Sequence, residues 1–129
     1  MKDNVSRVLI VDPDPLFAGR VRDALSSEGY DVEVAEGITQ AVQRLENASY
    51  GCVIVDEALP EMKGYDAVPI LRAAFPDLTV IMTAVNNTSE LEARIRRQPI
   101  FFYHVKSFDI YELRMAVRNA FGKMEVTRE

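Results

Sequence analysis

Residues 8–14 read VLIVDPD, and this stretch decides the fold class. Its first four residues, 8–11, are all apolar, which is typical of a central strand covered on both faces. Two acids, Asp12 and Asp14, follow the strand at once. The stretch therefore predicts a parallel sheet between layers of helices, with a polar site at the carboxyl end of its strands.

Four more short apolar segments alternate with stretches of helical periodicity along the 129 residues. The strands are predicted at 8–11, 32–35, 52–55, 78–82 and 100–105, the second of them an edge strand because its residues alternate between apolar and polar. The helices are predicted at 17–25, 38–45, 65–75, 89–96 and 110–121. This pattern predicts one α/β domain with a doubly wound, five-stranded parallel sheet.

The helix boundaries rest on particular residues. Pro69 falls inside the third helical stripe and is tolerated only in a first turn, where its missing amide has no helical partner. Ser89 and Glu92 have the spacing of a capping box for a short, charged fourth helix with a solvated outer face. Gly122 is predicted to end the last helix, so the domain is placed at 1–122 and a polar tail or linker at 123–129.

Composition excludes several classes of function. Lys and Arg number 15 against 20 Asp and Glu, a formal net charge of -5, which has the wrong sign for direct nucleic-acid binding. No apolar run approaches the roughly 20 residues of a membrane span, and the first residues have no apolar segment of a signal peptide. The single Cys52 cannot form an internal disulfide and is predicted to be a small core residue. We therefore expect a cytoplasmic protein with no membrane contact.

Polar residues gather where the predicted strands end. Asp12 and Asp14 follow the first strand, Asp56 the third, Thr83 the fourth and Lys106 the fifth. The carboxyl ends of parallel strands meet at one edge of the sheet, so these side chains are predicted to form one site. Acids, a hydroxyl and a cation suit Mg²⁺ together with an anionic group held between metal and ammonium.

These segments resemble the receiver domain of bacterial response regulators, whose flavodoxin-like fold has the strand order 2-1-3-4-5. The resemblance rests on residues 8–14, on residues 56–64 as a D-x-x-x-P-x-x-x-G loop, on Thr83 followed by alanine, and on residues 103–106. It covers nearly the whole chain. It implies a phosphoacceptor signalling module, not an enzyme, that takes a phosphoryl group from a histidine kinase or phosphotransfer protein and acts on an effector domain or protein.

The resemblance also implies a role for each residue. Asp56 would accept the phosphoryl group, Thr83 would bond to it, and Lys106 would pair with its oxygens. Asp12, Asp56 and the backbone carbonyl of Ala58 would bind Mg²⁺, with Asp14 as a further candidate ligand. Thr83 and Tyr103 would form the switch, although a plain core role is an equal interpretation of Tyr103.

One departure bears on the metal. Receiver domains usually place two consecutive acids after the first strand, and here Pro13 stands in the second place. Pro13 therefore predicts weak Mg²⁺ binding, and a pseudo-receiver with impaired phosphorylation is one alternative function. Another is a small phosphatase of the haloacid-dehalogenase type, since its D-x-D motif is met by Asp12 and Asp14. For these two acids the structural alternative is a helix cap or a first-turn acid.

The resemblance and the charge pattern together suggest a partner surface. Thr83 and Tyr103 lie at the root of the surface made by the fourth helix, the fifth strand and the last helix. The charges of the fourth helix offer both signs to a two-fold contact, so a second copy of the chain is one candidate partner. Tyr111 and Met115, outside the apolar stripe of the last helix, would add a hydrophobic anchor. His104 is predicted to be structural.

Overall fold

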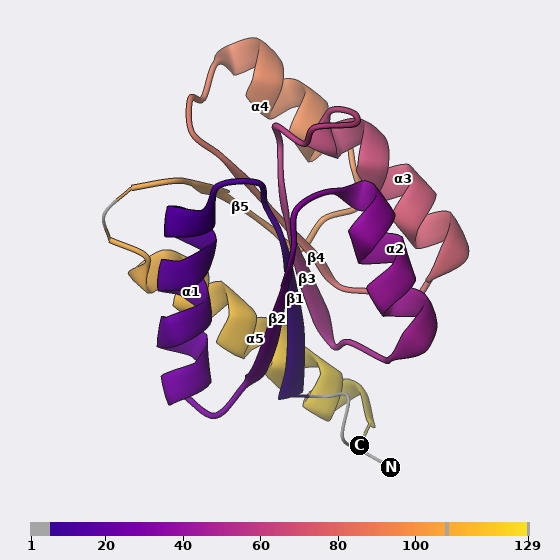
Figure 1. Cartoon of the computed structure of the whole chain (residues 1–129), viewed down its shortest axis with the longest axis vertical. Helices are drawn as coiled ribbons and strands as arrows, with labels where there is room; N and C mark the ends of the chain where they lie inside the picture. The colour runs from indigo at the N-terminus through magenta and orange to yellow at the C-terminus, as the bar shows by residue number, and fades with distance from the viewer. Residues whose placement is uncertain (1–5, 108, 129) are drawn as a thin grey trace.

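The computed structural model describes residues 6–107 and 109–128, with side chains as far as Gly122. Residues 1–5, which bear on the expected absence of a signal peptide, and Glu129 of the predicted tail lie outside the described residues. Strands and helices alternate strictly along the chain (Figure 1). Their bounds are β1 Arg7–Val11, α1 Pro15–Ser27, β2 Asp31–Ala35, α2 Ile38–Asn47, β3 Cys52–Asp56, α3 Gly64–Ala74, β4 Val80–Ala84, α4 Ser89–Arg96, β5 Phe102–Val105 and α5 Tyr111–Arg128.

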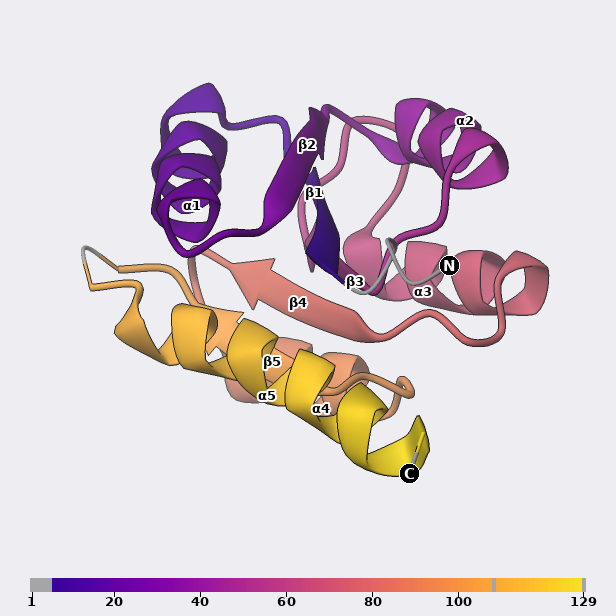
Figure 2. The same ribbon diagram turned by 90° about the horizontal axis from the view of Figure 1, so that it is seen from below.

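The five strands form one parallel sheet in the order β2-β1-β3-β4-β5, which confirms the predicted topology. Helices α1 and α5 pack on one face, and α2, α3 and α4 supply buried side chains to the core on the other. Figures 1 and 2 show α1 on the side of the sheet opposite α2 and α3. Because helices cover both faces, the residues of β3 and β4 are buried throughout, as the apolar runs predicted.

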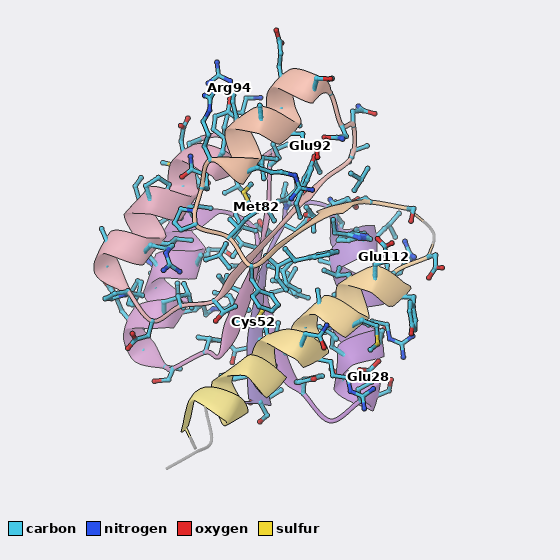
Figure 3. All side chains as sticks on the ribbon, turned by 180° about the vertical axis from the view of Figure 1, so that it is seen from behind. Glu28, Cys52, Met82, Glu92, Arg94 and Glu112 are labelled. Carbon is cyan, nitrogen blue, oxygen red and sulfur yellow. The ribbon has the colours of Figure 1, made fainter. Side chains whose placement is uncertain are left out.

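The core agrees with the sequence pattern in its individual residues. Cys52 and Met82 are fully buried among the strands, whereas Glu92 and Arg94 lie on α4 (Figure 3). Burial raises the pKa of the Cys52 thiol to about 12, so the thiol stays protonated and behaves as a small apolar group.

Helix α3 corrects the expectation for Pro69. The helix begins at Gly64 and continues to Ala74, so Pro69 lies in its second turn, beyond the first turn to which it was confined. A proline in a helix interior costs about 3 kcal/mol. Pro69 is on the exposed side, while the residues around it bury Ala67, Val68 and Leu71 in the core. That burial offsets the missing hydrogen bond, which local propensity could not show.

Two helix ends also differ from the prediction. The cap of α4 is Thr88, whose hydroxyl accepts the amide of Leu91 at 3.1 Å, and Ser89 is already the first helical residue. Helix α5 runs through Gly122 to Arg128, so the expected end at Gly122 is wrong and most of the predicted tail is helical. A glycine ends a helix when it adopts a positive φ, as Gly29 does after α1, and Gly122 does not.

Among the described residues, no helix is both long and apolar enough to cross a bilayer.

His104 is buried on β5, and neither ring nitrogen has a hydrogen-bond partner among the residues described. Desolvation lowers the pKa of His104, against the opposing charges of Glu112 and Asp109. Below the ordinary value of about 6.5 the unfolded chain therefore binds a proton that the folded chain refuses. Folding stability should be complete above this value and fall as the pH drops through it.

We expect His104→Leu to remove that dependence and to raise the free energy of unfolding at neutral pH by about 1–3 kcal/mol, because two unsatisfied nitrogens leave the core. Urea denaturation of both proteins at about pH 7.5 and about pH 5.5 measures this, since the window brackets the unfolded pKa. The same loss of stability in both proteins between these pH values would contradict it.

Candidate functional site

Four side chains converge at the carboxyl edge of the sheet. Asp12 follows β1, Asp56 ends β3, Thr83 lies in β4 and Lys106 follows β5. The parallel register sets Asp56 opposite Thr83. The backbone fixes the other two residues, because the Asp12 amide donates to Ala35 at 2.9 Å and the Lys106 amide donates to Ala84 at 2.8 Å. The strand ends therefore meet as the sequence predicted.

The Lys106 ammonium is the centre of this cluster. Its Nζ lies 2.8 Å from Oδ2 of Asp12 and 3.0 Å from Oδ1 of Asp56. The same Oδ1 of Asp56 accepts the Thr83 hydroxyl at 2.9 Å, and Oδ2 accepts the amide of Ala58 at 3.0 Å. Asp12 and Asp56 are each 3% exposed and Thr83 is fully buried. The site thus holds two acids against one cation in a place with little water.

Burial and pairing act against each other on the pKa values of these groups. Desolvation raises the pKa of Asp12, and its hydrogen bond from Lys106 offsets this only in part. Burial would lower the pKa of Lys106, but its hydrogen bonds to Asp12 and Asp56 outweigh burial and raise it. Lys106 is therefore a firmly charged ammonium beside an excess of carboxylate, and the site favours a further cation.

Asp14 lies outside this cluster. Its Oδ1 accepts the amides of Leu16 at 3.1 Å and Phe17 at 3.5 Å, so its carboxylate is the N-cap of α1. The helix-cap alternative is therefore confirmed for Asp14. Asp12 is different, since its Oδ1 accepts the amide of Asp14 at 2.9 Å while its Oδ2 contacts Lys106. Pro13, between them, is exposed.

The loop after Asp56 is closed by backbone contacts between its two ends. The Gly64 amide donates to the Glu57 carbonyl at 2.7 Å, and Ala58 forms an isolated bridge with Lys63. A Cβ on Gly64 would lie 2.3 Å from the backbone oxygen of Asp56, so only glycine fits there. The glycine of the D-x-x-x-P-x-x-x-G motif thus lets α3 begin directly against the strand that carries Asp56.

The donor set fits Mg²⁺ in its hydrated mode of binding. The metal is usually held by one or two carboxylates and keeps several waters, and Asp12 and Asp56 supply two carboxylates that both contact Lys106. Within the described part of the chain, no group of three or more His, Cys, Asp or Glu side chains is arranged to hold a metal. The position of Pro13 accounts for the missing third acid.

A closed set of contacts beside the site, here called the contact ring, joins Tyr103, Asn87, Glu92 and Arg96. Its hydroxyl donates to Oδ1 of Asn87 at 2.7 Å, and Nδ2 of Asn87 donates to Glu92 at 3.0 Å. Nε of Arg96 donates to the same Glu92 carboxylate at 2.9 Å, and its guanidinium lies 5.6 Å from the centre of the Tyr103 ring. Desolvation and the charge of Glu92 raise the pKa of Tyr103, so its hydroxyl remains a donor.

The predicted solvated face of α4 is confirmed, because Ser89, Glu90, Ala93, Arg94 and Arg96 are exposed. Glu92 and Arg96 form the expected i,i+4 pair, and both also reach toward Tyr103. Arg94 lies over the Tyr65 ring of α3, 5.6 Å from its centre. The sequence argument missed Asn87, for which the polar loop after Thr83 was the only signal. It also missed Phe17 as the ring beside the Lys106 ammonium, at 4.4 Å.

The fold and the site together define a class: an open parallel α/β domain whose strand ends bring two acids, a hydroxyl and a lysine together. A family model described as the response regulator receiver domain matches residues 8–118. The chain belongs to this family of two-component systems, whose members are generally signalling modules that interact with histidine kinases and effector domains.

Similar proteins agree with this assignment. The DNA-binding transcriptional regulator NtrC of Rhizobium meliloti is 26% identical over 106 residues, which cover 82% of this chain and 22% of that protein. The signal receiver domain of an HD domain-containing protein from Pseudomonas fluorescens has a TM-score of 0.89 at 26% identity, with coverage of 99% and 94%. The response regulator TrrA from Thermotoga maritima, solved with Mg²⁺ and BeF, has a TM-score of 0.78 at 25% identity, with coverage of 89% and 98%.

The chain thus spans less than a quarter of the length of this NtrC relative.

Proposed function

We propose that this chain takes a phosphoryl group from a histidine kinase or phosphotransfer protein onto the carboxylate of Asp56. The observation that carries the proposal is the position of Asp56, whose Oδ1 meets both Lys106 and Thr83. Transfer of a phosphoryl group needs alignment and neutralised charge more than covalent help from the protein. Lys106 supplies one positive charge, and bound Mg²⁺ supplies charge neutralisation when held by Asp12, Asp56 and the Ala58 carbonyl.

The transfer replaces one bond to phosphorus by another. An oxygen of Asp56 forms a bond to phosphorus as the bond from phosphorus to the donor imidazole breaks, and the imidazole keeps the electron pair. Lys106 then pairs with the new phosphoryl oxygens, and the Thr83 hydroxyl, which donates to Asp56 now, turns to one of them. We expect acetyl phosphate with Mg²⁺ to add one phosphoryl group, measured as a gain in intact mass. No gain under any donor would contradict the proposal.

The pseudo-receiver is a second candidate, favoured by one observation. Pro13 occupies the place of an acid, and the carboxylate of Asp14 is engaged at the start of α1. A protein that binds its partner equally well with and without beryllofluoride, and that gains no mass, would belong to this class. The phosphatase alternative gains nothing from the structure, because Asp14 caps α1 instead of joining Asp12 in the site.

The switch surface is proposed at α4, β5 and α5. Thr83 lies one strand from Tyr103, and the contact ring links Tyr103 to the loop before α4 and to α4 itself. A phosphoryl group on Asp56 would take the Thr83 hydroxyl from the carboxylate, and the resulting shift of β4 would reach Tyr103 on the neighbouring strand and loosen this ring. The surface that α4 and β5 present would change, which is what an effector or a second copy of the chain can sense.

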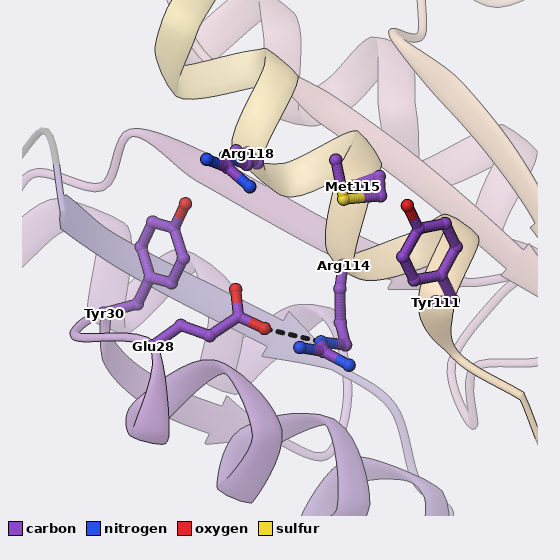
Figure 4. Close-up of a pocket in the computed structure, with 6 residues that line it drawn as sticks. All are labelled: Glu28, Tyr30, Tyr111, Arg114, Met115 and Arg118. Carbon is purple, nitrogen blue, oxygen red and sulfur yellow. Dashed lines mark hydrogen bonds and ion pairs between the residues drawn. The ribbon is translucent and has the colours of Figure 1, made fainter.

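We expect beryllofluoride, which imitates the phosphoryl group, to increase self-association or association with an effector, and Arg94→Glu to weaken it. Tyr111 is 58% exposed and shares a hollow with Glu28 at the end of α1, so Tyr111→Ala tests whether the surface extends around α5 to that side. Tyr111 and Met115 line a hollow of about 560 Å³ beside the Glu28–Arg114 ion pair (Figure 4). Sedimentation velocity measures the change. Unaltered association with the mimic and with both substitutions would place the output surface elsewhere.

A further inference from the structure

Glu61 ties the loop of Asp56 to a distant helix. Its Oε1 accepts the amide of Ile38 at 3.0 Å and its Oε2 accepts the amide of Thr39 at 3.4 Å. These are the first two residues of α2, whose own N-cap residue, Gly37, has no side chain to bond them. The hydrogen bond from Ile38 lowers the pKa of Glu61, so the carboxylate is ionised at neutral pH.

Space, and not backbone conformation, requires a glycine before α2. Gly37 has a φ of -165°, which any residue adopts, but a Cβ there would lie 2.4 Å and 2.7 Å from the two carboxylate oxygens of Glu61. The colliding atoms are the far end of a flexible side chain. A methyl group at this position would therefore displace the Glu61 carboxylate while leaving the backbone of the turn in place.

The tie joins the two halves of the site. The last residue of β2 holds Asp12, because the Ala35 carbonyl accepts the Asp12 amide at 2.9 Å. Three residues further on, the first amide of α2 holds Glu61, which lies in the loop that carries Ala58. On the inner side of that loop, Leu59 is buried in the core. Glu61 secures the outer side.

We propose that Glu61 is a positioning residue, which fixes the loop of Asp56 and Ala58 relative to Asp12 through its bonds to the start of α2. This inference rests on the proposed function, because its purpose is to place the groups that would bind Mg²⁺ and phosphoryl oxygens. Glu61 touches neither. Removing the Glu61 carboxylate leaves all four side chains of the site present. It lets the loop that carries Ala58 move relative to Asp12.

Two kinds of variant release the tie. Glu61→Ala removes the carboxylate, and Gly37→Ala displaces it. Glu61→Gln retains an accepting oxygen and should therefore keep most of the wild-type affinity for Mg²⁺. Glu46→Ala is the matched control, since it removes an exposed acid near the other end of α2. We expect the two releasing variants to weaken Mg²⁺ affinity by about three- to tenfold, and the Gln variant and the control by less than about twofold.

Hydrogen exchange of the Ala58 amide, which bonds Asp56, is the second measurement and needs no metal. We expect exchange about tenfold faster in the two releasing variants, because the loop opens more often. If wild-type protein binds no Mg²⁺, the proposed function fails while this exchange still tests Glu61. Exchange and Mg²⁺ affinity that match the wild type, with only a lower melting temperature, would show that Glu61 is a helix cap and nothing more.

Discussion

An Asp56→Asn protein should gain no mass from acetyl phosphate and Mg²⁺ under conditions in which the wild type gains one phosphoryl group. The amide that replaces the carboxylate is neutral and a poor nucleophile toward phosphorus. Its single oxygen can still accept the Thr83 hydroxyl, although its nitrogen cannot accept the Ala58 amide as the second carboxylate oxygen does. The expected result is a complete loss of phosphoryl uptake in a folded protein, measured by intact-mass spectrometry.

The matched control is Asp12→Asn. It should slow phosphoryl uptake by weakening Mg²⁺ binding but should not abolish it, because Asp12 does not receive the group. A mass gain that survives Asp56→Asn would overturn the assignment of Asp56.

Pro13→Asp should tighten Mg²⁺ binding by about tenfold, or about 1.4 kcal/mol, because it adds a carboxylate beside Asp12. The present structure offers Asp12 and Asp56 to the metal, while the side chain of Asp14 is held by the first amides of α1. Calorimetric titration of Mg²⁺ into both proteins makes the comparison.

Pro13→Ala is the control that removes the proline ring without adding the carboxylate of Pro13→Asp. It should bind Mg²⁺ as the wild type does, within about twofold, because an alanine adds no ligand. Equal affinity for Mg²⁺ in the wild type and in Pro13→Asp would show that Asp14 or water already fills the place of the missing acid.

The sequence predicted the sheet and the meeting of the strand ends because both follow from short-range patterns. Apolar runs define covered strands, and parallel pairing brings the residues after 11, 55, 82 and 105 to one edge without further information. For Pro69 and Gly122, by contrast, the short-range pattern gave the wrong prediction, because contacts with the rest of the fold decide whether these helices continue. Their local propensities are strong, but packing of α3 in the core outweighs the first, and the second is simply accommodated within α5.

Contacts between distant segments account for what the sequence left open in the site. Asp12 and Asp14 are the same residue type two positions apart, so the sequence does not distinguish them. The path of the loop places Asp12 against Lys106 and Asp14 at the N-terminus of α1. Glu61 was invisible because its partners are 23 and 22 residues away. One signal was available: Gly37 precedes a helical stripe without offering a capping side chain, which suggests a cap from elsewhere in the chain.

The most direct test of the central claim is to locate the phosphoryl group after transfer. The wild-type protein is incubated with acetyl phosphate and Mg²⁺, the acyl phosphate is trapped by reduction with borohydride, and the modified residue is found by fragment sequencing. A single modification at Asp56, dependent on Mg²⁺, is the predicted result. Modification at Asp12, or none at either aspartate, would contradict the claim that Asp56 is the phosphoacceptor of this receiver domain.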